Sequence, residues 1–298
     1  MVQQILNYRI ERLLSEGGMS RVYLGVDPVT GQRVAIKELL PHLATLDDLR
    51  ERFRREAQFM VRLNHPNIVR SIQYEEKGNC LFLVQEYIEG INLEEYIINH
   101  RGLIPEEEAK ALFCQLLDVV AYGHENDVIH CGIQPSSVTV TGENQVKVIN
   151  FCSEKIVRES ISGFAQKPLR RGWSPYQSPE QVNGREVDER TDIYLLGVLL
   201  HQMLTGKSPY DIGTYSEFEL LVKIVKEPLP RMKGFNEHLS CGIQAIVDKA
   251  TAKEKSARYQ SCKEFMQAIN SLKGSIQGEP WWTRLGKSLM VGAAARIC

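Results

Sequence analysis

The chain has 298 residues, 43% hydrophobic and 24% charged, a composition that supports one large folded unit or two lobes with a shared core. Its formal net charge of −1 gives no electrostatic basis for nucleic acid as a partner. Seven cysteines without a C-x-x-C pair disfavour a disulfide framework or a zinc site and indicate a reducing, cytoplasmic compartment. We expect neither a secretory signal at the start nor a membrane span.

The first third of the chain is predicted to be rich in strands. Residues 8–14 and 21–26 have strand character and flank a glycine pair, and 33–39 follows a turn that contains Pro28 and Gly31. Residues 47–64 are predicted to form a helix, because Leu49, Phe53, Ala57 and Met60 recur at helical spacing. A strand pair is expected over 67–76 and 80–88.

From about residue 92 the pattern becomes helical. Residues 104–126 begin with Pro105 and three acids, which suits the positive end of a helix dipole. Residues 191–206 are apolar on nearly all faces, which predicts a buried central helix capped by Gly206. Shorter amphipathic helices are expected over 241–251 and 262–272. The fold class is therefore α+β, with a small strand-rich lobe, a larger helical lobe and a tail.

Several motifs follow one another along these elements. They are SEGGMSRV (15–22), VAIK (34–37), FRREA (53–57), LNHPNIV (63–69), VQEYIEG (84–90), VIHCGIQPSS (128–137), VKVINFCSEK (146–155), YQSPEQ (176–181), DIYLLGVLLHQMLTGKSPY (192–210) and SARYQS (256–261). This ordered set resembles the eukaryotic-like serine/threonine protein kinases of bacteria. The resemblance implies a bilobal kinase-like domain over 8–272, with a small antiparallel β lobe (8–88) that carries one helix, a helical lobe (89–272) and a C-terminal tail (273–298).

The chemistry of the family requires a lysine on the phosphates, a glutamate that holds it, a catalytic aspartate and two metal ligands. The resemblance gives the first two roles to Lys37 and Glu56. The position of the aspartate is occupied by Gly132, which has no proton acceptor. The phosphate-contacting lysine and the two metal ligands are replaced by neutral residues: Gln134, Ser137 and Asn150. Since Mg²⁺ is captured through carboxylates, no metal site is expected.

These losses decide the functional prediction. A missing general base alone lowers a rate by roughly 10²–10⁴, against typical kinase turnover of about 1–100 per second. The sequence therefore predicts a pseudokinase that scaffolds or allosterically regulates a protein partner, for example an active kinase. Two alternatives stay open: an active serine/threonine kinase with an atypical site, and a nucleotide-sensing switch.

The residues that support the kinase fold are retained. The resemblance implies that His130 and Phe151 stack in the core, that Asp192 anchors the backbone of the catalytic loop, and that Glu180 and Arg258 form a buried ion pair. The frame of the catalytic loop is thus expected to persist without its chemistry.

Nucleotide binding is left open between weak, Mg²⁺-independent binding of ATP and none. Val22 and Ala35 match residues above the adenine, Thr139 the residue below it, and Gln85 the gatekeeper, while the backbone of Glu86 and Ile88 would meet the adenine edge. The full set that the resemblance implies is Ser15, Gly17, Gly18, Val22, Ala35, Lys37, Glu56, Gln85, Glu86, Ile88 and Thr139.

The activation segment and the C-terminal tail lie beyond the cleft and carry residues for other contacts. Cys131 replaces the arginine that pairs with a phosphorylated activation segment, so no phospho-switch is expected. Cys131 and Cys152 are read as inert thiols. The basic residues of the segment are read as a solvated loop in preference to a docking surface for an acidic partner: Lys155, Arg158, Lys167, Arg170 and Arg171. The tail has an apolar helical face that can pack on the large lobe, on a partner or on a membrane surface: Trp281, Trp282, Leu285, Leu289 and Met290.

Overall fold

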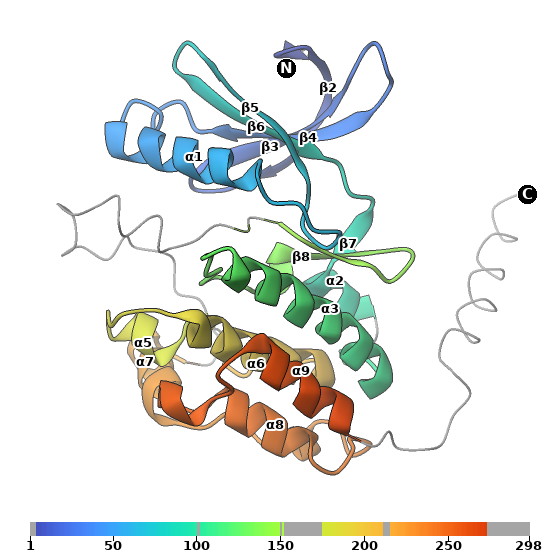
Figure 1. The fold of residues 1–298 in the computed structure, drawn as a ribbon, viewed down its shortest axis with the longest axis vertical. Helices are drawn as coiled ribbons and strands as arrows, with labels where there is room; N and C mark the ends of the chain where they lie inside the picture. Colours follow the sequence, from blue (N-terminus) through green and yellow to red (C-terminus); the bar gives the residue numbers. More distant parts are fainter. Residues whose placement is uncertain (1–3, 100–101, 150, 152–174, 211–214, 273–298) are drawn as a thin grey trace, which may run out of the picture.

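The computed structural model describes residues 4–99, 102–149, 151, 175–210 and 215–272. Asn150, the basic residues of the activation segment, Cys152 and the tail lie outside these described residues. Figure 1 shows a sheet and one helix at one end of the molecule and a group of helices at the other. No helix among the described residues is long and apolar enough to cross a membrane.

The N-terminal end is a six-stranded antiparallel sheet in the order β1-β2-β3-β4-β6-β5. The first strand lies before residue 8, where the domain was expected to begin, and pairs Gln4 with Arg9. The strands are β1 (Gln4–Ile5), β2 (Tyr8–Glu16), β3 (Ser20–Val26), β4 (Arg33–Leu39), β5 (Ser71–Lys77) and β6 (Cys80–Glu86).

Alternation along β4 separates its two faces. Val34 and Ile36 are buried in a cluster with Tyr23 and Val84, whereas Ala35 and Lys37 point to the opposite face. Successive residues of a strand point to opposite sides, so this register directs Lys37 toward the helical end of the molecule.

The single helix of this lobe, α1 (Asp47–Met60), packs on the sheet through Phe53, Ala57 and Met60. It ends at Met60, four residues before the predicted end. The polar side of α1 is joined to β5 through one carboxylate: Arg50 Nη2 and Arg54 Nε lie 2.6 and 2.7 Å from the oxygens of Glu76.

The C-terminal lobe contains a small sheet, β7-β8-β9, and a set of helices. The strands are β7 (Gly90–Asn92), β8 (Val138–Thr141) and β9 (Val146–Val148). The α-helices are α2 (Leu93–Asn99), α3 (Glu106–Glu125), α5 (Pro179–Val182), α6 (Glu189–Thr205), α7 (Glu217–Lys226), α8 (Ile243–Ala250) and α9 (Cys262–Ser271). Short 3₁₀ turns are η1 (Pro135–Ser137), η2 (Met232–Gly234) and η3 (Lys255–Ala257).

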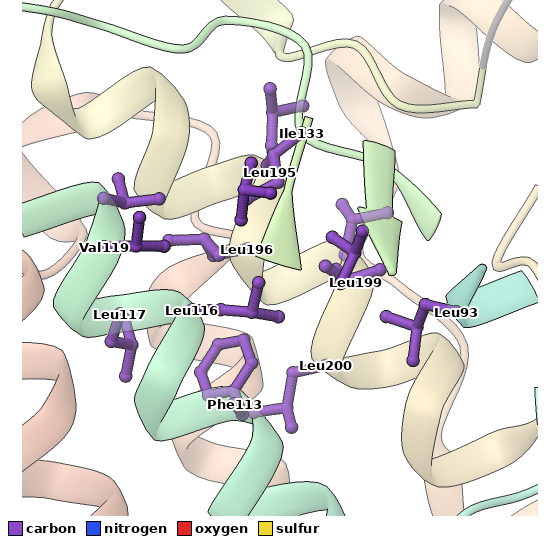
Figure 2. Packing of buried hydrophobic residues seen from close by; sticks show 14 of the residues in the cluster. Leu93, Phe113, Leu116, Leu117, Val119, Ile133, Leu195, Leu196, Leu199 and Leu200 are labelled. Atoms are coloured by element: carbon purple, nitrogen blue, oxygen red, sulfur yellow. The ribbon is translucent and has the colours of Figure 1, made fainter. Parts of the chain in front are cut away.

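The centre of this lobe is α6, which is buried on every side from Thr191 to Thr205, as its apolar sequence predicts. Figure 2 shows side chains of α3 and α6 packed together: Phe113, Leu116, Leu117, Val119, Leu195, Leu196, Leu199 and Leu200. The helix begins earlier than predicted, because the carboxylate of Asp188 accepts a hydrogen bond from Arg190 N at 2.9 Å. Gly206 caps its end in the left-handed conformation, with φ +68°.

Candidate functional site

The ion pair expected between Lys37 and Glu56, within the N-terminal lobe, is formed. Lys37 Nζ on β4 lies 3.5 Å from Glu56 Oε1 on α1, and the two side chains are 17% and 16% exposed. Lys37 also lies 5.9 Å from the ring centroid of Phe53. Because both charges are largely shielded from water, their attraction is less screened than in a surface pair.

The sheet register gathers the residues expected above a nucleotide. Residues directly opposite one another in a ladder share a face. Val22 lies opposite both Ser15 and Lys37, and Ala35 lies opposite Gln85. Ser15, Val22, Ala35, Lys37 and Gln85 therefore line the same face of the sheet.

The glycine-rich loop joins β2 to β3 as a short turn. Gly17 N donates to Ser20 O at 2.9 Å, which closes the loop. A Cβ on Gly18 would meet no atom within 4 Å, so packing does not demand glycine there. Glu16 and Arg21 pair across the base of the loop at 3.0 Å.

The segment between the lobes is held by Glu86. Its Oε1 accepts a hydrogen bond from Lys147 Nζ at 2.8 Å and another from Arg70 N at 3.0 Å. Thr139 on β8 lies opposite Lys147 on β9, so it belongs to the small sheet on the C-terminal side of this segment. The gatekeeper Gln85 is buried and donates from Nε2 to Ser71 Oγ at 3.2 Å. Ile88 follows in the link to β7. Sequence reasoning missed Lys147, because its partner lies 61 residues away.

The backbone of the catalytic loop is anchored by Asp192, which is fully buried in α6. Its two oxygens accept hydrogen bonds from His130 N at 2.8 Å and Cys131 N at 2.7 Å. His124 Nε2 lies 2.8 Å from the same carboxylate, a contact that sequence reasoning missed. The rings of His130 and Phe151 meet edge to face, with centroids 5.2 Å apart.

Gly132 lies in this anchored loop. Among the described residues, the atom nearest to a Cβ at Gly132 would be His130 O, at 3.9 Å. Crowding of the Cβ by the described residues therefore does not explain the missing aspartate. At the arginine position, Cys131 is buried in an apolar cluster with Ile129 and Val187. Its carbonyl accepts a hydrogen bond from Gln181 Nε2 at 2.7 Å.

Ser137, at the position of the second metal ligand, makes its hydrogen bonds within the loop itself. Ser137 is 5% exposed, and its Oγ donates to Gln134 O at 2.7 Å and accepts from Gln134 N at 3.0 Å. Among residues 4–272, leaving out the gaps named above, no three His, Cys, Asp or Glu side chains are grouped so that they could hold a metal ion. Asn150, the other ligand position, lies outside the described residues. Of the two ligand positions, the described one therefore offers no carboxylate to Mg²⁺, only a hydroxyl that is already hydrogen-bonded.

The ion pair that braces the helical lobe is bidentate and buried. Arg258 Nη1 and Nη2 each lie 2.8 Å from one oxygen of Glu180, and the two side chains are 0% and 4% exposed. Burial raises the pKa of Glu180, but hydrogen bonds from Arg258 and Thr191 outweigh it and leave that pKa below its usual value. Arg258 also donates to three backbone carbonyls, those of Ala252, Arg190 and Lys253.

Comparison with known proteins agrees with this geometry. Residues 8–270 match the family model described as protein kinase domain. The chain is 33% identical over 264 residues to the serine/threonine-protein kinase PrkC of Bacillus subtilis, covering 89% of this chain and 40% of that protein. It is 33% identical over 261 residues to PknB of Mycobacterium leprae, covering 86% and 41%.

The fold is similar to solved structures as well. The Mycobacterium tuberculosis PknI kinase domain has a TM-score of 0.69 at 24% identity and covers 91% of this chain and 98% of that chain. The chain spans only about 40% of the length of the curated relatives named here. The extent of the family match, together with the bilobal fold, shows that this chain belongs to the protein kinase domain family.

Proposed function

We propose that this kinase domain transfers no phosphate and acts by binding a protein partner, as a scaffold or an allosteric regulator. The observation that carries the proposal is Gly132, which stands where the family places its catalytic aspartate, in a loop that Asp192 still anchors. The backbone of the catalytic loop keeps its anchor, whereas position 132 has no proton acceptor.

The size of the loss supports this reading. Removing a general base lowers a rate by roughly 10²–10⁴. The hydroxyl of Ser137 is engaged with Gln134, which adds the loss of a metal ligand. Such losses do not add simply, but both act on the same transition state, in which positioning and charge stabilisation provide nearly all of the catalysis.

The comparisons favour the alternative, an active serine/threonine kinase with an atypical site. PrkC and PknB are named as serine/threonine-protein kinases, and the Lys37–Glu56 pair that the reaction requires is formed here. This alternative needs another acid at the substrate hydroxyl. The acid nearest in sequence, Glu154, lies outside the described residues.

Membership of the family implies ATP as a ligand, usually with Mg²⁺. We propose weak binding that does not depend on Mg²⁺, with the phosphates near Lys37 and the adenine against the backbone of Glu86 and Ile88. The reason is that Ser137 and Asn150 stand at the two metal-ligand positions, so neither position offers a carboxylate. A nucleotide-sensing switch remains the variant of this proposal in which binding closes the lobes.

Thermal unfolding tests the proposal, with ATP or ADP added in Mg²⁺ or in chelator. A ligand at 100 times its Kd adds about 2.7 kcal/mol of stability, which shifts the midpoint visibly. A shift that is equal with and without Mg²⁺ supports a nucleotide-binding regulator, and no shift supports a scaffold with an empty cleft. A shift that requires Mg²⁺ contradicts the proposal and favours the active kinase.

A further inference from the structure

A cavity of about 240 Å³ lies far from the kinase cleft, between η2 and the beginning of α8. Its inner wall is apolar, from the buried side chains Met232, Leu239 and Ile243, and the exposed Cys241 lies at its rim. Sites for small molecules usually measure about 300–1,000 Å³. The volume therefore suits one large side chain better than a nucleotide-sized metabolite.

The walls of this cavity are fixed by hydrogen bonds. Gln244 Oε1 accepts from Met232 N at 2.8 Å, which ties η2 to α8. The carboxylate of Glu106 at the start of α3 accepts from Ser240 N at 2.7 Å and from Ser240 Oγ, and Lys110 Nζ lies 3.3 Å from it. A site that is already formed loses little conformational entropy when it is filled.

The described chain ends beside this cavity. Gly242, on the rim, has φ +105°, and a Cβ there would lie 3.0 Å from Leu272 Cδ2. Leu272 is the last described residue, so residues 273–298 follow directly after a residue that lies beside Gly242. The helix predicted over 241–251 begins later, at Ile243, because Cys241 and the left-handed Gly242 precede α8.

The length and composition of the tail suit a return to the cavity. Eight residues, 273–280, separate Leu272 from Trp281. They can span at most about 26–29 Å at roughly 3.3–3.6 Å per residue. They include Gly274, Gly278 and Pro280, which are residues that favour turns. Trp281 and Trp282 then supply the kind of large aromatic side chain that anchors contacts in apolar pockets.

We propose that the tail of the same chain docks by inserting one tryptophan of the Trp281–Trp282 pair into the cavity between η2 and α8. The occupant is the tail and neither a second copy nor a membrane, because the short connection gives the pair an effective concentration on the order of millimolar at this site. The docking would fix the position of whatever follows the kinase domain relative to its helical lobe. It is independent of whether the domain transfers phosphate.

Alkylation of Cys241 by iodoacetamide tests the proposal, mapped by peptide mass spectrometry in the 298-residue chain. We expect Trp281→Ala/Trp282→Ala to raise the alkylation rate of Cys241 by at least about threefold. If the tail is docked in two-thirds of the molecules, the thiol is accessible in only one-third of them. Cys80, in the other lobe, is the internal reference. A matched variant further along the tail, Leu289→Ala/Met290→Ala, should leave the rate at Cys241 unchanged.

Equal rates at Cys241 with and without the tryptophans would overturn the proposal. So would protection that disappears on tenfold dilution, since that result assigns the cavity to a second copy. Protection that occurs only with vesicles of phosphatidylglycerol and phosphatidylcholine would assign the tail to a membrane surface and also overturn it. Protection that is independent of dilution and of vesicles supports it.

Discussion

Replacing Arg258 with methionine should destabilise the helical lobe far more than the loss of a surface ion pair. The guanidinium is fully buried and makes two 2.8 Å contacts with Glu180 and three hydrogen bonds to backbone carbonyls. Removing one partner of a buried pair leaves an uncompensated charge and costs about 3–5 kcal/mol. Urea unfolding at pH 7.5 measures this loss directly.

The double variant Glu180→Gln/Arg258→Met is the matched control. It removes the charge that the single variant leaves buried, so it should lose less stability than Arg258→Met alone. If Arg258→Met lost under about 1 kcal/mol, the range of exposed ion pairs, the assignment of Arg258 as the brace of the lobe would be refuted.

The pH dependence of the same variants gives a second check. In the native chain the pKa of Glu180 is lowered, so its contribution to stability is present above the pKa of the unfolded chain and lost as pH falls through the folded pKa. Without Arg258, burial dominates and raises that pKa. The extra loss in Arg258→Met should therefore be larger at pH 7.5 than at pH 5.5, and the reverse order would contradict the reasoning.

Three further variants test single residues by urea unfolding. Gly206→Ala should be severely destabilised, because φ is +68° and the new Cβ would collide with Gly102 O; near-native stability would mean that the cap is not needed. Gly132→Asp should change the free energy of unfolding by no more than about 0.5 kcal/mol, since no described atom would lie closer than 3.9 Å to the new Cβ; a loss above about 2 kcal/mol would show that glycine is required for space. Ser137→Ala should lose about 1 kcal/mol, because Gln134 N is left without its partner in a partly buried turn, and an unchanged midpoint would contradict the role assigned to its hydroxyl.

Periodic features of the fold could be predicted from the sequence. Alternation in β4 separates Ile36 from Lys37, and the all-round apolar pattern of 191–206 predicts the burial of α6. The cap at Gly206 follows from its place after the last apolar residue. Each of these signals is local, so a single chain segment carries it.

The remaining features depend on contacts between distant segments. Glu76 joins α1 to β5 across 22 and 26 residues, and Lys147 reaches Glu86 across 61. Charged pairs at such separations have no period in the sequence, in contrast to pairs three or four residues apart on a helix. The role of Gly242 was missed for a similar reason, because its conformation matters through the contact with Leu272.

Transfer of label from γ-labelled ATP distinguishes a kinase fold that is retained without phosphoryl transfer from an active kinase. The chain, with Mg²⁺ or Mn²⁺, is incubated with itself and with a generic basic protein substrate, beside a Lys37→Met variant as the matched control. Incorporation of label by the native chain should equal that of Lys37→Met in every condition. Metal-dependent incorporation that Lys37→Met abolishes would contradict this expectation and establish an active kinase that works without an aspartate at position 132.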